Sequence, residues 1–155
     1  MELNEHNKKE YPPMHTAEHL LNQTMVRMFG CERSKSSHIE RKKSKCDYFL
    51  KENLTFEQIA DIESAVNHQI EQNLPVSVLF VDKNNVPVGV DLSKLPDNVS
   101  DTLRLVTIGD YDVCACIGDH VNNTSEIGRF KIISSDYNDG KLRIRFKLEN
   151  TLYAE

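Results

Sequence analysis

Residues 55–81 read TFEQIADIESAVNHQIEQNLPVSVLFV and predict a helix followed directly by a strand. Thr55 and Gln58 have the spacing of a capping box, which marks the start of the helix. The helix is also predicted by apolar residues that recur every three or four positions, namely Phe56, Ile59, Ile62, Val66 and Ile70. Pro75 ends the helical pattern, and the apolar run Val76–Val81 is typical of a buried strand.

The rest of the chain is predicted to add one more helix and several strands. Towards the C-terminus, strands are expected at residues 104–108, 112–116, 126–134 and 141–148. Towards the N-terminus, a hairpin is expected within Ser37–Lys51, and a helix over Met14–Phe29 that ends at Gly30. Residues 1–13 are expected to form an irregular lead-in. Two main helices packed with a mostly antiparallel sheet indicate an α+β fold, and a length of 155 residues indicates one domain, 1–155.

The composition of the chain excludes several classes of protein. Its formal net charge of −5 argues against a protein that coats nucleic acid without specificity, although a local basic patch can still bind one RNA end. No apolar run approaches the roughly 20 residues that span a bilayer, and the polar N-terminus lacks the apolar core of a secretory signal. We therefore expect a cytoplasmic protein without membrane association. The cysteines are interpreted as thiols, and they are Cys31, Cys46, Cys114 and Cys116.

Two short motifs carry side chains that can bind a metal. The motif HTAEH places His15 and His19 one turn apart on one helix face, where both can bind one ion. The motif CIGDH supplies the thiolate of Cys116 and the imidazole of His120. Three nitrogens and one sulfur suit Zn²⁺, but spacing alone neither brings the two motifs together nor excludes ordinary solvated histidines. Cys114 points to the same side of a strand as Cys116, so it stays an alternative ligand at this point.

Several segments stand in a fixed order along the chain: HTAEHLL at 15–21, RLVTIGDY at 104–111, CIGDHV at 116–121, and Thr124 with EIG at 126–128 and FKI at 130–132. Together they resemble the signatures of the editing domain of alanyl-tRNA synthetases. The resemblance spans about residues 14–148. Because activation and anticodon-binding modules do not fit in 155 residues, we expect a relative of the freestanding alanyl-tRNA editing proteins of the AlaX type.

The resemblance implies an alanyl/threonyl-tRNA synthetase editing-domain-like fold and one bound Zn²⁺. It implies that the zinc ligands are His15, His19, Cys116 and His120. It also implies a trans-editing hydrolase that deacylates mischarged tRNA(Ala), with seryl-tRNA(Ala) as the first expected substrate and glycyl-tRNA(Ala) as the second. A pocket built for alanine cannot strongly reject serine, so a second site has to hydrogen-bond the hydroxyl group. The candidate side chains that sense the substrate are Thr16, Ser36 and Ser37.

Basic side chains form two candidate RNA-binding surfaces. The first is a cluster that follows the first helix and contains Arg33, Lys35, Arg41, Lys42, Lys43 and Lys45. The second is one face of the last predicted strand, which carries Lys141, Arg143, Arg145 and Lys147. A solvated outer face that resists edge pairing is the alternative interpretation of that strand. Phosphate contacts release counterions, so genuine RNA binding should weaken steeply with salt.

Two other functions fit parts of the sequence. The spacing H-x-x-E-H also occurs in a class of zinc metallopeptidases, in which Glu18 would be the general base, although those enzymes are as a rule much larger. The second alternative is a non-catalytic, zinc-stabilised RNA-binding module. It is favoured by Lys35 and by Asp119, which stands where the editing family usually has a small or hydroxyl residue. Deacylation of charged tRNA would separate the editing hydrolase from both alternatives.

Overall fold

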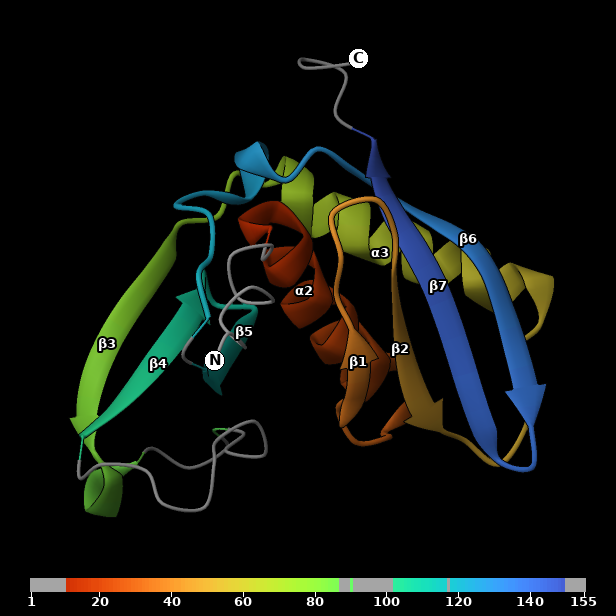
Figure 1. Ribbon diagram of the computed structural model, residues 1–155, viewed down its shortest axis with the longest axis horizontal. Helices are drawn as coiled ribbons and strands as arrows, with labels where there is room; N and C mark the ends of the chain where they lie inside the picture. The colour runs from red at the N-terminus through yellow and green to blue at the C-terminus, as the bar shows by residue number, and fades with distance from the viewer. Residues whose placement is uncertain (1–10, 87–89, 91–101, 117, 150–155) are drawn as a thin grey trace, which may run out of the picture.

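The computed structural model describes residues 11–86, 90, 102–116 and 118–149, and within them it contains two α-helices and two antiparallel sheets (Figure 1). The four-stranded sheet has the order β1 (Ser36–His38), β2 (Ser44–Phe49), β7 (Lys141–Glu149) and β6 (Arg129–Asn138). The three-stranded sheet has the order β3 (Val76–Asp82), β4 (Thr102–Ile108) and β5 (Asp112–Ala115). Helix α2 (Pro12–Phe29) lies between the two sheets, and α3 (Phe56–Glu71) packs along the four-stranded one. The predicted α+β class is confirmed.

Both helices were predicted from their end signals. Helix α2 begins at Pro12, two residues earlier than expected, because proline is well suited to the first helical turn, where its missing N–H is not needed. It ends at Gly30, which has a φ of 70° and donates its N–H to the carbonyl of Val26. The expected lead-in therefore stops before Pro12, and residues 1–10 lie outside the described residues. No helix in the described part of the chain is long and apolar enough to cross a membrane.

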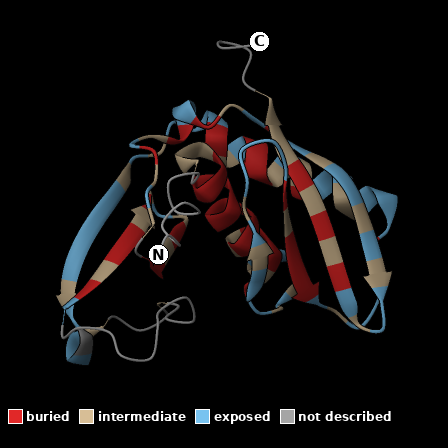
Figure 2. Ribbon diagram, in the orientation of Figure 1, coloured by how far each residue is buried: buried red, intermediate tan, exposed pale blue. Residues whose placement is uncertain are grey.

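Helix α3 has the capping box that its sequence predicts. The hydroxyl of Thr55 accepts a hydrogen bond from the backbone N–H of Gln58, and the side chain of Gln58 accepts one from the N–H of Thr55. The buried residues of α3 fall on one stripe, and they are Ile62, Val66, Asn67 and Ile70. This stripe, α2 and the inner face of β7 form the main core, in which Leu142, Ile144 and Phe146 are fully buried (Figure 2).

Strand β3 forms where it was predicted, but the prediction that it is buried is wrong. Val78, Leu79 and Phe80 are 40%, 51% and 68% exposed (Figure 2). Among the described strands β3 pairs only with β4, so it is the edge of the three-stranded sheet. An apolar run indicates extended backbone, but it does not reveal whether another layer covers the sheet.

Candidate metal centre

Helix α2 carries the first two candidate ligands into the interior. The ring centroids of His15 and His19 are 5.3 Å apart, one helical turn along the same face. His15 is 8% exposed and His19 is fully buried. Two ordinary solvated histidines would be expected on the outer face of a helix, so their burial excludes that alternative.

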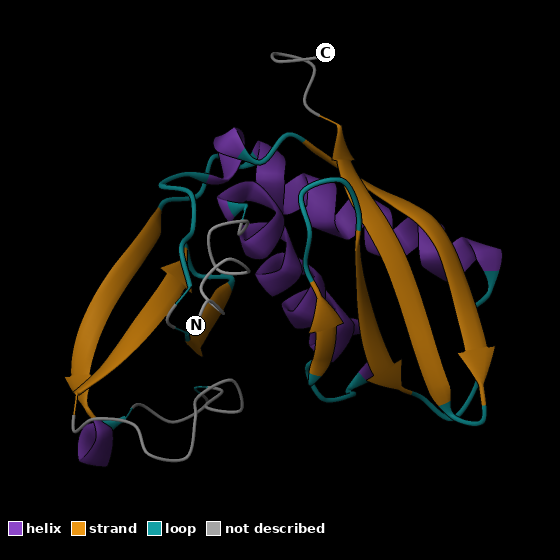
Figure 3. Cartoon of the chain, in the orientation of Figure 1, coloured by secondary structure: helices purple, strands orange, loops and turns teal. Residues whose placement is uncertain are grey.

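The second pair, Cys116 and His120, lies on the loop that follows β5 (Figure 3). The guanidinium group of Arg104 donates to the carbonyl oxygen of Cys116 at 3.0 Å and to that of the glycine two residues later at 2.8 Å. The backbone N–H of Val121 donates to the hydroxyl oxygen of Thr16 at 3.1 Å. The loop is thus fastened to β4 on one side and to α2 on the other.

These contacts bring all four side chains to one point. One potential ligand atom from each of His15, His19, Cys116 and His120 lies within 4.8 Å of the others. The Nε2 atoms of His19 and His120 are 3.1 Å apart, and Sγ of Cys116 is 3.7 Å from Nε2 of His15. A tetrahedral zinc ion with its usual bond lengths has N···N edges of about 3.3 Å and N···S edges of about 3.6 Å. The donor set and its spacing therefore fit Zn²⁺.

The cysteine that belongs to the candidate cluster is Cys116 and not Cys114, its neighbour in the strand. Cys114 is fully buried, and its thiol lies 3.5 Å from the carbonyl oxygen of Ala115. Burial alone would raise the pKa of Cys116, but hydrogen bonds from His120, His15 and His19 outweigh it and lower that pKa to about 3. Burial lowers the pKa of His120. A thiolate and a neutral imidazole are the forms in which these groups bind metal.

Sequence reasoning missed a buried ion pair behind His19. Nδ1 of His19 lies 3.5 Å from Oδ2 of Asp112, and the guanidinium of Arg33 donates to both carboxylate oxygens of Asp112 at 2.7 and 3.2 Å. Burial opposes ionisation of Asp112, but His19 and Arg33 outweigh it and lower its pKa. Arg33 is only 8% exposed, so its interpretation as an RNA contact is wrong. The two residues are 79 positions apart, and no local pattern could have joined them.

Comparison with known proteins gives this cluster its context. Residues 103–145 match the family of the threonyl and alanyl tRNA synthetase second additional domain. Over 90% of its length the chain is 36% identical to an alanine–tRNA ligase of Caldicellulosiruptor saccharolyticus, and over 93% it is 30% identical to one of Methanococcus maripaludis. The chain is related to the alanyl-tRNA synthetase editing domain. It spans only 16% and 17% of the length of these two relatives.

The three candidate substrate-sensing residues of this chain lie in different surroundings. The hydroxyl of Thr16 is fully buried, donates to the carbonyl of Pro12 at 2.8 Å and accepts from Val121, so it joins helix and loop. Ser36 is exposed on β1, and half-buried Ser37 donates to Ser34 Oγ at 3.0 Å. Thr16 on α2 therefore contacts the loop that carries Cys116 and His120, whereas Ser36 and Ser37 lie on β1.

The candidate RNA-binding residues of this chain divide into two groups. Lys35, Arg41, Lys42 and Lys43, here called the hairpin cluster, are exposed before and within the turn between β1 and β2. Within that cluster Lys35 lies 3.2 Å from Glu32 in an exposed pair. On β7, Arg143 forms two hydrogen bonds to Asp47 at 2.8 and 3.0 Å, and Arg145 lies 2.7 Å from Asp136. The predicted alternation of that strand is confirmed, but its arginines are already held in ion pairs.

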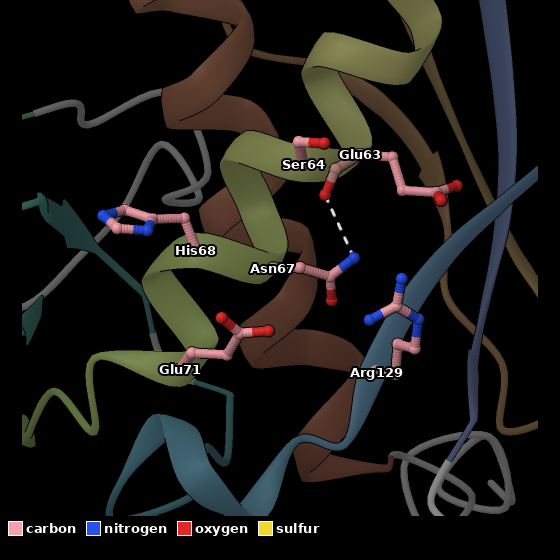
Figure 4. A pocket seen from close by; sticks show the side chains of 6 residues that line it. All are labelled: Glu63, Ser64, Asn67, His68, Glu71 and Arg129. Atoms are coloured by element: carbon pink, nitrogen blue, oxygen red, sulfur yellow. Dashed lines mark hydrogen bonds between the residues drawn. The ribbon is translucent and has the colours of Figure 1, made fainter.

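A hollow of about 250 Å³ lies between α3 and the start of β6 (Figure 4). Its lining residues are polar or charged, and they are Glu63, Ser64, Asn67, His68, Glu71 and Arg129. Asn67 is used structurally here, because its amide bonds both the N–H and the carbonyl of Phe130 at 2.8 Å. The hollow shares no residue with the candidate metal cluster.

Proposed function

We propose that the chain is a zinc-dependent trans-editing hydrolase that deacylates mischarged tRNA(Ala), acting first on seryl-tRNA(Ala) and second on glycyl-tRNA(Ala). One observation carries this proposal: three imidazoles and a thiolate converge in a chain related to the alanyl-tRNA synthetase editing domain. We place the activity in the cytoplasm, where the charged tRNA would be met.

The cluster has one closed side and one open side. His19 and Glu18 are fully buried, whereas His120 is half-buried and Asp119 is exposed. The ester at the end of the tRNA would therefore approach from the side of His120. Zn²⁺, when held by the four side chains, supplies a positive charge that can polarise an ester or lower the pKa of water. The chain itself orients this charge and excludes water from the buried side.

Glu18 does not fit the metallopeptidase alternative. Its carboxylate is 1% exposed, and Oε1 lies 3.6 Å from Nε2 of His15. A general base must reach the attacking water from the solvent side of the metal. Glu18 lies on the closed side of the cluster, so we assign it no general-base role.

Substrate recognition is proposed to involve two surfaces. The hairpin cluster offers exposed cations for phosphate groups in a chain of net charge −5, and Arg143 and Arg145 are proposed as secondary contacts. For the serine hydroxyl we keep Ser36 and Ser37 as the proposed sensors. Thr16 was a third candidate, and its two structural hydrogen bonds favour a role in holding the loop.

The deciding experiment is deacylation of purified seryl-, glycyl- and alanyl-tRNA(Ala) by the zinc-loaded chain. We expect serine to be released fastest, glycine next, and alanine to stay attached, with Cys116→Ala as the inactive control. Raising salt should weaken the reaction at low substrate concentration, since phosphate contacts release counterions. Folded, zinc-loaded protein that hydrolyses none of the three would contradict the proposal.

A second candidate function is a non-catalytic, zinc-stabilised RNA-binding module. It is favoured by the complete donor set, because four protein ligands are the pattern of structural zinc sites, whereas catalytic sites keep one position open. This candidate predicts tRNA binding that depends on salt without any release of amino acid. The deacylation experiment and a binding measurement on the same preparation distinguish the two functions.

A further inference from the structure

The ring of His19 is contacted from both of its nitrogen atoms. Nε2 faces the other ligands, 3.1 Å from Nε2 of His120, and Nδ1 faces Oδ2 of Asp112 at 3.5 Å. The side chains of His19 and Asp112 are 0% and 1% exposed. Asp112 is the first residue of β5, so a strand that ends at the centre also supports a ligand on α2 from behind.

Asp112 is itself held in a fixed orientation. Nη1 and Nη2 of Arg33 donate to its two carboxylate oxygens at 2.7 and 3.2 Å, and both side chains are buried. Such a paired fork fixes the plane of the carboxylate as well as its position. It also compensates the charge, because an isolated carboxylate would be very costly to bury. The chain Arg33–Asp112–His19 therefore connects the segment after α2, strand β5 and helix α2.

The three imidazoles differ in what lies behind them. Nδ1 of His15 lies 3.3 Å from the backbone carbonyl of Asp119. Nδ1 of His120 and Nδ1 of His19 are both buried, and neither forms a hydrogen bond of ordinary geometry among the described residues. The neighbour of His19 Nδ1 is the Asp112 carboxylate at the ion-pair distance of 3.5 Å. Of the three, His19 is the one that has a carboxylate at this position among the described residues. A neutral imidazole that binds metal through Nε2 carries its proton on Nδ1, where a carboxylate can accept it.

We propose that Asp112, held by Arg33, is a positioning residue for His19: it selects the tautomer and ring orientation that present Nε2 to the metal. The proposal rests on the metal centre of the proposed function. Such partners of a metal-binding histidine typically change metal affinity by about 10–100-fold when they are replaced. Asp112 acts through His19 and does not contact the metal or the substrate.

The test compares two Arg–Asp pairs in the full-length chain, each with two hydrogen bonds to a buried carboxylate; Arg33 is buried and Arg143 is 30% exposed. Asp112→Asn removes the carboxylate behind His19, and Asp47→Asn removes the one bonded to Arg143, which is not near the ligands in sequence or in the sheet order. Zinc affinity is measured by competition with a chelator, and the absorption bands of bound Co²⁺ report the ligand geometry. We expect Asp112→Asn to bind zinc about 10–100-fold more weakly with altered Co²⁺ bands, and Asp47→Asn to match the wild type.

Arg33→Lys is a second variant that keeps the positive charge but loses the two parallel hydrogen bonds to the carboxylate of Asp112. We expect it to weaken zinc binding less than Asp112→Asn does. Circular dichroism and the Tm of each metal-free variant identify any that fails to fold.

Two outcomes overturn the positioning role. In the first, Asp112→Asn matches the wild type in affinity and in Co²⁺ spectrum. In the second, Asp112→Asn and Asp47→Asn lose affinity equally, which would trace the loss to general destabilisation. If the wild type itself binds no zinc, the metal centre of the proposed function is wrong, and this outcome differs from both others.

Discussion

Helices α2 and α3 are similar in length, with 18 and 16 residues, but they are built in opposite ways. Helix α3 buries a single stripe that contains one polar residue, Asn67. Helix α2 buries eleven residues, of which six are polar: His15, Thr16, Glu18, His19, Asn22 and Thr24 (Figure 2). Burial of that many polar groups is unfavourable unless each is hydrogen-bonded or binds a ligand. Helix α3 therefore contributes mainly to the hydrophobic core, whereas α2 also positions the polar side chains of the candidate metal centre.

The end structures of the two helices agree with this division. Helix α3 is stabilised locally by its capping box, whereas Tyr11, the N-cap of α2, makes no side-chain capping bond. Helix α2 is held instead by distant residues. Tyr111 alone accepts hydrogen bonds at its backbone carbonyl from Gln23 and Arg27, and its hydroxyl lies 2.6 Å from that of Thr24.

Replacing one histidine on each helix should give the largest contrast. His19→Ala removes a metal ligand, so zinc should no longer raise the Tm and deacylation should be lost. At a zinc concentration of 1,000 times Kd the missing stabilisation would be about 4 kcal/mol. His68→Ala changes an exposed residue of α3, and its effect on stability should stay within about 0.5 kcal/mol. Thermal melts with and without zinc measure the change in Tm for each variant. If zinc raises the Tm of both variants equally, the proposed difference between α2 and α3 is wrong.

The buried asparagines should give a smaller, purely structural contrast. Asn67→Ala leaves the N–H and carbonyl of Phe130 without their partner, which should cost about 2–4 kcal/mol in the free energy of unfolding. Asn22→Ala should cost about 1–3 kcal/mol. It leaves the hydroxyl of Tyr48 and the N–H of Ser34 without an acceptor, but it also removes a buried amide nitrogen that has no hydrogen-bond partner among the described residues. Urea denaturation of zinc-loaded protein measures both costs. Asn67→Ala should keep the zinc affinity of the wild type, and a loss of affinity would show that α3 also contributes to the centre.

The smallest effect is expected at the cap of α3. Thr55→Ala removes the hydroxyl that accepts from Gln58 N–H and should lower the free energy of unfolding by about 1 kcal/mol. Zinc affinity should not change, since α3 contributes no ligand. The measurement is again urea denaturation, with Thr55→Ser as the variant that retains the cap. If the alanine and serine variants are equally stable, the capping box does not stabilise α3.

Sequence patterns predicted the two helices better than the surroundings of the strands. The start of α3 depends on residues three positions apart, and the end of α2 depends on Gly30, so both are local. The exposure of β3 is not local, because Phe80 is extended and apolar whether or not a layer covers it.

The candidate ligands were found through short motifs and a resemblance, since spacing alone could not join His15 to Cys116. The buried ion pair of Arg33 and Asp112 could be found neither from short motifs nor from the resemblance. Arg33 was one basic residue in a basic segment, and Asp112 was one acidic residue at the start of a strand. Only the fold places the two side chains in contact.

The four candidate ligands come from two segments, and the two closest approaches of their ligand atoms described above, His15 with Cys116 and His19 with His120, each join residues 101 positions apart. A ribosome that adds about 5–20 residues per second needs roughly 5–20 s to make the intervening chain. During that interval α2 exists without Val121, Asp112 or either later ligand. The nascent helix cannot reach its final burial by local folding alone. If the cluster binds zinc as proposed, capture of the ion would be a late event in the synthesis of each molecule, and it would coincide with completion of the domain rather than with its nucleation.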